Sequence, residues 1–170
     1  AQCSVAREDG RWVALRHSEV VEAASDAVTF SSGVSARRAI PNSLDGVEHA
    51  AYRTVVDRYF SDERVAGEEA QCRTHAAAIV DGLPRGVTVK TVAGIGVPYA
   101  VRSQSTWLGW PATLEEDLVA WMQDNHAATR SGDRSWTREV AARFDAMIHE
   151  LLEARRDHAG TDVTSQLMRD

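Results

Sequence analysis

The clearest pattern along the chain is a hydrophobic repeat in its last third. Apolar residues recur there at every fourth position: Trp136, Val140, Phe144, Ile148 and Leu152. This spacing places the apolar side chains on one face of an α-helix. It predicts a long amphipathic helix that runs through about Arg156.

Weaker patterns of the same kind predict further helices. They are expected at residues 17–24, 45–59, 61–82, 92–110 and 114–128, with one more beginning at 161–162. Ser18 and Ser61 are typical N-caps for two of them. Asp45 and Glu48 resemble a capping box, in which two side chains satisfy backbone amides of the first helical turn.

Few segments favour other structure. Residues 11–16 and 87–89 are predicted strands. Residues 26–43 show no periodicity, and a loop of this length is uncommon in a compact domain unless it has a function. Ser131, Gly132 and Asp133 predict a mobile turn between two amphipathic helices. The chain shows no internal repeat and no linker.

Charge and composition narrow the function classes. The 170 residues include 19 basic and 25 acidic side chains, for a net charge of −6. An acidic chain of this kind argues against nucleic acid or an anionic membrane as a partner. The uncharged stretches are shorter than the roughly 20 apolar residues that a membrane span needs. Two cysteines are too few for a disulfide scaffold, and no leader-like segment opens the sequence, so a cytoplasmic location is expected.

His49 and Arg53 are the strongest candidates for a binding site. Their spacing of four residues puts both on one face near the start of a predicted helix, where an anion between them would relieve their mutual repulsion. A carboxylate is a natural guest, because arginine can bind it through two hydrogen bonds. The alternative is a solvated surface pair, with Glu48 or Asp57 as the local counter-charge.

The segment from Ala39 to Arg53 (Ala-Ile-Pro-Asn-Ser-Leu-Asp-Gly-Val-Glu-His-Ala-Ala-Tyr-Arg) resembles the loop and helix that enter the haem pocket of bacterial cytochrome P-450 monooxygenases. Residues 12–16, 20–23, 29–32, 55–61, 151–156 and 160–165 are similar, in the same order, to other parts of that family. The resemblance implies a mainly α, cytochrome P-450-like fold, with small strands near the start and then helices B to G. It implies that residues 1–170 are a single partial domain, a fragment without the central oxygen-activating helix or the haem-ligating cysteine loop.

The resemblance also implies roles for individual residues. His49 and Arg53 would bind the propionates of haem b, and Ile40 and Asn42 would contact the substrate. No catalytic residue or metal ligand is expected in this chain, because neither Cys3 nor Cys72 lies in the glycine-rich context of the axial cysteine. The helices around residues 121–130 and 136–152 would form a substrate-access lid.

The implied function is that of a haem-dependent monooxygenase. Such an enzyme inserts one oxygen atom from O2 into a small hydrophobic organic substrate and receives electrons from a ferredoxin or flavodoxin-type redox partner. The 170-residue chain by itself is expected to be inactive. Two alternatives stay open: a non-catalytic helical module that binds another carboxylate or a phosphate, and an inactive truncated fragment.

Overall fold

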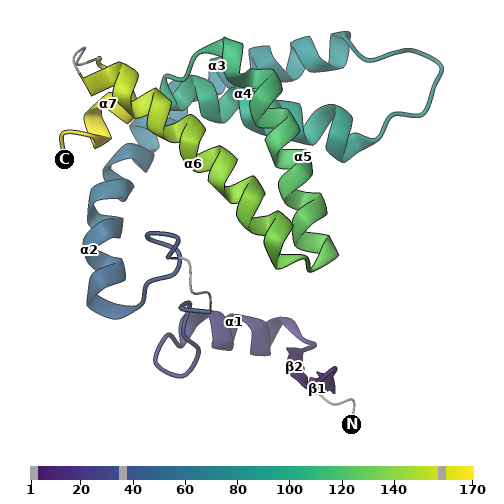
Figure 1. Ribbon diagram of the computed structural model, residues 1–170, viewed down its shortest axis with the longest axis vertical. Helices are drawn as coiled ribbons and strands as arrows, with labels where there is room; N and C mark the ends of the chain where they lie inside the picture. The colour runs from purple at the N-terminus through teal and green to yellow at the C-terminus, as the bar shows by residue number, and fades with distance from the viewer. Residues whose placement is uncertain (1–3, 35–37, 157–159) are drawn as a thin grey trace. The chain divides into compact units, whose positions relative to one another are not determined.

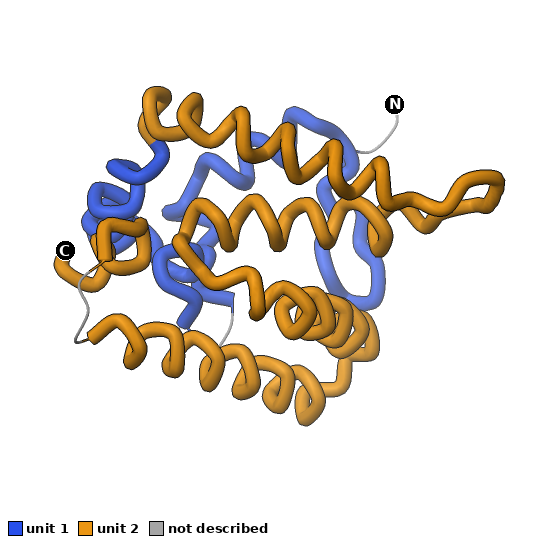
Figure 2. The backbone as a smooth tube through the Cα atoms, turned by 90° about the horizontal axis from the view of Figure 1, so that it is seen from above, with its two compact units in different colours: residues 1–60 blue, residues 61–170 orange. Residues whose placement is uncertain are grey.

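The computed structural model describes residues 4–34, 38–156 and 160–170 (Figure 1). Contacts within the chain divide it into two compact units, residues 1–60 and residues 61–170 (Figure 2). Each unit has its own secondary structure and is described by itself. The interpretation of residues 1–170 as one partial domain stays a prediction.

Unit 1 begins with an antiparallel hairpin. Strand β1 (Val5–Glu8) pairs with β2 (Arg11–Ala14), and the turn between them places Asp9 and Gly10 at positive φ, which suits a tight two-residue connection. The second strand was predicted. The first was not, because its sequence Val-Ala-Arg-Glu lacks alternation. On β2, Trp12 is 74% exposed, and the Arg7 guanidinium carbon lies 5.6 Å from the centre of its ring.

Two helices and a short 3₁₀ turn complete unit 1: α1 (His17–Ser25), α2 (Gly46–Asp57) and η1 (Arg58–Phe60). The prediction of Ser18 as an N-cap is wrong. The N-cap residue is Arg16, two residues earlier, and the Ser18 hydroxyl donates to the Glu19 carboxylate at 2.9 Å. The predicted loop between the two helices is confirmed over its described residues. Asp26 opens this loop by accepting the backbone amides of residues 28 and 29 at 3.2 and 3.1 Å.

The regular secondary structure in the described residues of unit 2 is helical. Its elements are α3 (Asp62–Asp81), the π-helical turn η2 (Val92–Gly96), α4 (Val97–Leu108), the 3₁₀ turn η3 (Ala112–Leu114), α5 (Glu115–Ser131), α6 (Arg134–Arg156) and α7 (Val163–Leu167). The Ser61 side chain caps α3 as predicted. The strand predicted at residues 87–89 is wrong, because this segment lies in a loop that extends from the helices between α3 and η2 (Figures 1 and 2).

The core of unit 2 lies where α4, α5 and α6 meet. Val97, Val101 and Leu118 are buried there, with further side chains of α5 and α6 packed against them. Helices α5 and α6 run side by side in opposite directions (Figure 1). The Trp121 and Phe144 rings stack with centres 4.1 Å apart. Val140 is completely buried, so the predicted hydrophobic repeat of α6 is confirmed as a packing face.

A polar corner joins the ends of α4 and α6 to the start of α7. Asp162 caps α7 by accepting the Ser165 amide at 3.0 Å and the Ser165 hydroxyl at 2.8 Å. The Arg155 side chain, 14% exposed, donates to Asp162 at 3.4 Å and to the carbonyl of Gly109. Gly109 has a φ of +74°, and a Cβ atom there would lie 2.2 Å from the Cβ of Asp162. The corner therefore requires glycine at position 109.

Candidate cofactor-binding site

The two cations singled out from the sequence both lie in α2. Their helix begins at Gly46, after Asp45, and ends at Asp57. His49 and Arg53 are one helical turn apart and both are half-buried, while Glu48 and Ala50 beside them are exposed. This arrangement presents an imidazole and a guanidinium on one face of one helix, as the spacing predicts.

Arg53 already has one carboxylate partner. Its guanidinium donates through one terminal nitrogen to Asp57, one turn further along α2, and the two side chains are 41% and 54% exposed. A guanidinium carries five N–H donors, so this ion pair leaves donors for a second carboxylate. The counter-charge expected under the surface-pair interpretation is therefore present, and it does not use up the binding capacity of Arg53.

The start of α2 is built differently from the prediction. Asp45 is the N-cap residue, but its side chain makes no cap bond to α2. Instead it accepts the Ser31 hydroxyl at 2.5 Å and the Ser32 amide at 3.0 and 3.1 Å. Glu48 pairs with Arg38 at 2.6 Å. The prediction of a capping box is therefore wrong in its contacts, because both acids bind the preceding loop rather than the helix amides.

The hydrogen bonds that Asp45 accepts also change its acidity. Donation from the Ser31 hydroxyl, then from the Ser32 amide, stabilises the charged carboxylate and lowers the pKa of Asp45 below its ordinary value. The positive charge of His49 contributes in the same direction. Asp45 is therefore ionised at neutral pH.

The predicted substrate-contacting residues lie in the loop before α2. Ile40 and Asn42 are exposed, and the Ile40–Pro41 peptide bond is cis. The loop is closed by two bonds between residues 39 and 43, at 2.8 Å each, and is anchored by the buried side chain of Leu44. Ile40 and Asn42 are thus accessible on a structured loop, and their contact with a substrate stays a prediction.

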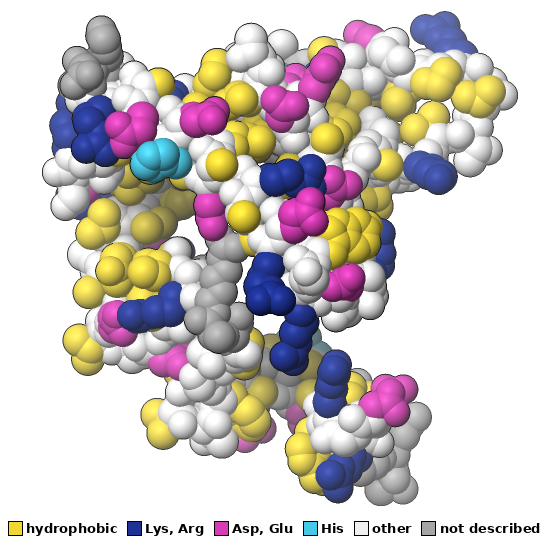
Figure 3. All heavy atoms as spheres, in the orientation of Figure 1, with side chains coloured by type: hydrophobic (Ala, Val, Ile, Leu, Met, Phe, Trp, Pro, Cys, Tyr) yellow, Lys and Arg dark blue, Asp and Glu magenta, His cyan; other side chains and the backbone are white. Residues whose placement is uncertain are grey.

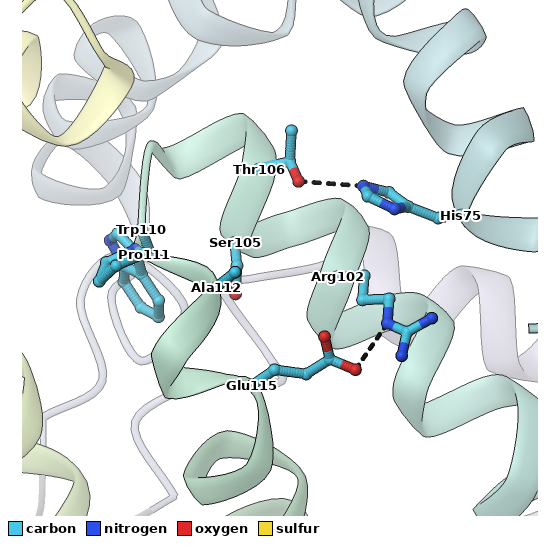
Figure 4. A pocket seen from close by; sticks show the side chains of 8 residues that line it. All are labelled: His75, Arg102, Ser105, Thr106, Trp110, Pro111, Ala112 and Glu115. Carbon is cyan, nitrogen blue, oxygen red and sulfur yellow. Dashed lines mark hydrogen bonds and ion pairs between the residues drawn. The ribbon is translucent and has the colours of Figure 1, made fainter. Parts of the chain in front are cut away.

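A second polar site lies in unit 2 and was missed from the sequence. A pocket of about 240 Å³ opens between α3, α4 and the start of α5 (Figure 4). His75 Nε2 lies 3.0 Å from the Thr106 hydroxyl, and Arg102 Nε donates to Glu115 at 2.6 Å. The pocket is also lined by Ser105, Trp110, Pro111 and Ala112. These residues come from separate segments of the chain, which is why no local sequence pattern brings them together.

Of the two cysteines, the structure describes Cys72. It is half-buried in the middle of α3 with a free thiol. Cys3 lies outside the described residues. Over the described ranges, no three side chains of His, Cys, Asp or Glu are grouped so that they could hold a metal ion. The helices of those ranges are also too short or too polar to cross a membrane.

The predicted lid corresponds to α5 and α6. The break between them is confirmed: α5 ends at Ser131, Gly132 has a φ of +71°, and α6 begins at Arg134. The connection is well bonded, because Asp133 accepts the amides of residues 135 and 136 at 2.8 and 3.2 Å. Its mobility and its role as a hinge stay predictions.

Two solved structures share this arrangement of helices. The open cytochrome P-450 Eryk from S. erythraea matches with a TM-score of 0.77 and 22% identity, over 95% of this chain and 44% of that chain. Cytochrome P-450 260B1 of Sorangium cellulosum matches with a TM-score of 0.76 and 19% identity, over 98% and 45%. This chain has the fold of the N-terminal part of a cytochrome P-450.

Sequence similarity agrees with the fold. Linalool 8-monooxygenase of Pseudomonas putida is 24% identical over 93% of this chain and 45% of its own length. Probable cytochrome P-450 127A1 of Sinorhizobium fredii is 26% identical over 90% of this chain and 38% of its own length. No family model matches the chain. The chain thus spans less than half of the length of these relatives, and the predicted mainly α, cytochrome P-450-like fold is confirmed.

Proposed function

We propose that this chain is part of a haem-dependent monooxygenase that inserts one oxygen atom from O2 into a small hydrophobic organic substrate. The similarity to cytochromes P-450, which extends over more than nine-tenths of the chain, carries this proposal. The name of the Pseudomonas putida relative, a linalool monooxygenase, supports a small apolar substrate.

Within this chain, His49 and Arg53 would hold the propionates of haem b. The donor set fits this group, because two side chains that can carry positive charge share a half-buried helix face, and Arg53 keeps unused donors beside its bond to Asp57. Ile40 and Asn42, accessible on the bonded loop before α2, would contact the substrate.

When bound, the haem would supply the oxygen chemistry, and a cysteine thiolate ligand would favour O–O cleavage. We place that cysteine outside residues 1–170, because Cys72 lies within a helix and is no part of a glycine-rich loop. This chain would bind and orient the haem by contacting the two haem propionates. A ferredoxin or flavodoxin-type protein would deliver the electrons, and residues 1–170 alone would be inactive.

The test is haem retention after substitution of Arg53. The complete reading frame that contains this chain is expressed, loaded with haem and mixed with excess apomyoglobin, and haem transfer is followed by absorbance. Arg53→Ala removes a charge-assisted hydrogen bond worth about 1.5–3 kcal/mol, so haem transfer should be about 10-fold faster or more. Arg73→Ala is the matched control, because Arg73 forms the same kind of exposed pair with Glu69 on α3.

Equal transfer rates for the two variants would overturn the assignment of Arg53. A protein that shows no Soret absorbance after loading would overturn the monooxygenase proposal itself and favour the non-catalytic binding module.

A further inference from the structure

Four side chains that can be charged follow one another along α2 at intervals of four residues: Asp45, His49, Arg53 and Asp57. Each basic residue therefore has an acid one turn away on the same helix face. Asp57 pairs directly with Arg53. Asp45 attracts His49, but its two oxygens are engaged elsewhere, by Ser31 and Ser32.

The contact of Asp45 with the serines bridges 13 to 14 residues of chain. The serines form a turn of their own, in which the Ser31 hydroxyl also accepts the Gly33 amide at 3.0 Å. The Asp45 carboxylate thus connects the turn at residues 31–33 to the residue that precedes α2. A charged acceptor with two donors is a strong and directional link.

Buried apolar packing is sparse in the described part of unit 1. Among its described residues, the buried hydrophobic side chains are Leu44 and Tyr59 alone. At the first helical position, Gly46 has a φ of +57°. A Cβ atom placed on this glycine would meet no other atom within 4 Å, so nothing packs against the backbone on that side. The second acidic contact, between Glu48 and Arg38, is more than half exposed on both sides. Polar contacts therefore decide the geometry.

We propose that Asp45 is a positioning residue for the cofactor: by fastening the turn at residues 31–33 to the start of α2, it fixes how His49 and Arg53 meet a haem carboxylate. This inference rests on the proposed function. It assigns Asp45 no contact with haem. Asp45 acts through the two residues that follow it on the same face.

The experiment compares natural haem with haem dimethyl ester, in which both propionates are blocked, in the complete reading frame. Without the Asp45 contacts, α2 would hold His49 and Arg53 in the binding geometry only part of the time, and the affinity for haem would fall by that fraction. We therefore expect about 5-fold faster loss of natural haem from Asp45→Ala. Loss of the ester should be unchanged, because the ester makes no ionic contact with His49 and Arg53. Asp45→Asn keeps the shape and one acceptor, and should show the same selectivity with a smaller factor.

Asp26→Ala is the matched control. Asp26 also closes a turn in the same loop by accepting two amides, but its hydrogen bonds stay within residues 22–30 and do not reach the start of α2. We expect this variant to lose natural haem and ester at the wild-type rates.

The outcomes separate this inference from the proposal on which it rests. If Arg53→Ala distinguishes natural haem from the ester but Asp45→Ala speeds the loss of both equally, Asp45 has only a structural role and the inference is overturned. If Arg53→Ala does not distinguish the two compounds, the propionate site and the inference fail together. Selective loss of natural haem from both variants supports the two.

Discussion

The two units of this chain are stabilised in different ways. Unit 2 has a hydrophobic centre at α4, α5 and α6, and its polar corner around Asp162 is largely enclosed. Unit 1 buries only Leu44 and Tyr59 among its described hydrophobic side chains, and exposes others such as Trp12 and Phe30. Hydrophobic side chains on the molecular surface can be seen in Figure 3. Packing therefore fixes unit 2, whereas hydrogen bonds from loops fix the site in unit 1.

Two aspartates at helix starts show this difference directly. Asp162 caps its own helix and binds Arg155. Asp45 stands at the equivalent position before α2 and binds a distant turn. The same residue type at the same local position thus strengthens a helix in one unit and connects a loop to a helix in the other.

The largest effect is expected at the packed corner of unit 2. Gly109→Ala would bring a Cβ atom to 2.2 Å from the Cβ of the Asp162 side chain and would strain a positive φ, so we expect a loss of about 3–5 kcal/mol in the free energy of unfolding. Urea denaturation measures it. Gly132→Ala is the control, since φ is also positive there but no atom lies within 4 Å, and it should cost about 1–2 kcal/mol. Equal losses would contradict the close approach at position 109.

The next effect compares the two aspartates. Asp162→Ala removes the cap of α7 and the carboxylate beside the largely buried Arg155, and should lower the free energy of unfolding by about 2 kcal/mol. Asp45→Ala should change global stability much less, because its carboxylate binds only the exposed residues Ser31 and Ser32, while it alters the site. Thermal unfolding of both variants checks this order. A larger stability loss for Asp45→Ala would break the distinction between the two units.

Acid should weaken the contacts that the Asp162 and Asp45 carboxylates make. Burial alone would raise the pKa of Asp162, but hydrogen bonds from Ser165 and the charge of Arg155 outweigh it, so the pKa is lowered; that of Asp45 is lowered by its serine donors. A lowered folded-state pKa means that each carboxylate stabilises the protein above about pH 4 and loses this effect as pH falls through the lower value. The difference in melting temperature between the wild type and Asp162→Asn should therefore shrink below pH 4. A constant difference down to pH 2 would contradict it.

The smallest effect concerns single tryptophans. Trp121→Phe keeps a ring against Phe144 but loses the bond from the indole to the Val140 carbonyl, which is 3.0 Å long, and should cost about 1 kcal/mol. Trp12→Phe, on the exposed hairpin of unit 1, should cost less than about 0.5 kcal/mol. Chemical denaturation distinguishes these values, and the reverse order would mean that unit 1 has a core that its burial does not show.

The fold was predictable where one local signal sufficed. The four-residue repeat of α6 and the Ser61 cap each depend on neighbours in the sequence, and each is confirmed. The strand at residues 87–89 failed because alternation over three residues has no meaning without a partner strand. The strand β1 was missed for the opposite reason, since its pairing partner and not its own pattern makes it a strand.

The candidate site was predictable only in part. The spacing of His49 and Arg53 is a local property, and the structure places them on one face. The partners of Asp45 and Glu48 lie 10 to 14 residues away, so the local capping pattern gave the right helix start and the wrong contacts. The pocket of unit 2 joins α3 to α4 and α5, and no local pattern could reveal it.

The exposed Trp12 has a spectroscopic consequence. It is the one tryptophan of the sequence in unit 1, and the other four, at positions 107, 110, 121 and 136, belong to unit 2. The indoles of residues 110 and 121 donate to protein acceptors and are half-buried, whereas the Trp12 ring faces solvent beside a guanidinium. Water-exposed indole emits at longer wavelength and is open to collisional quenchers. Quenching by iodide would therefore report selectively on the hairpin, and the remaining emission would follow the helices alone.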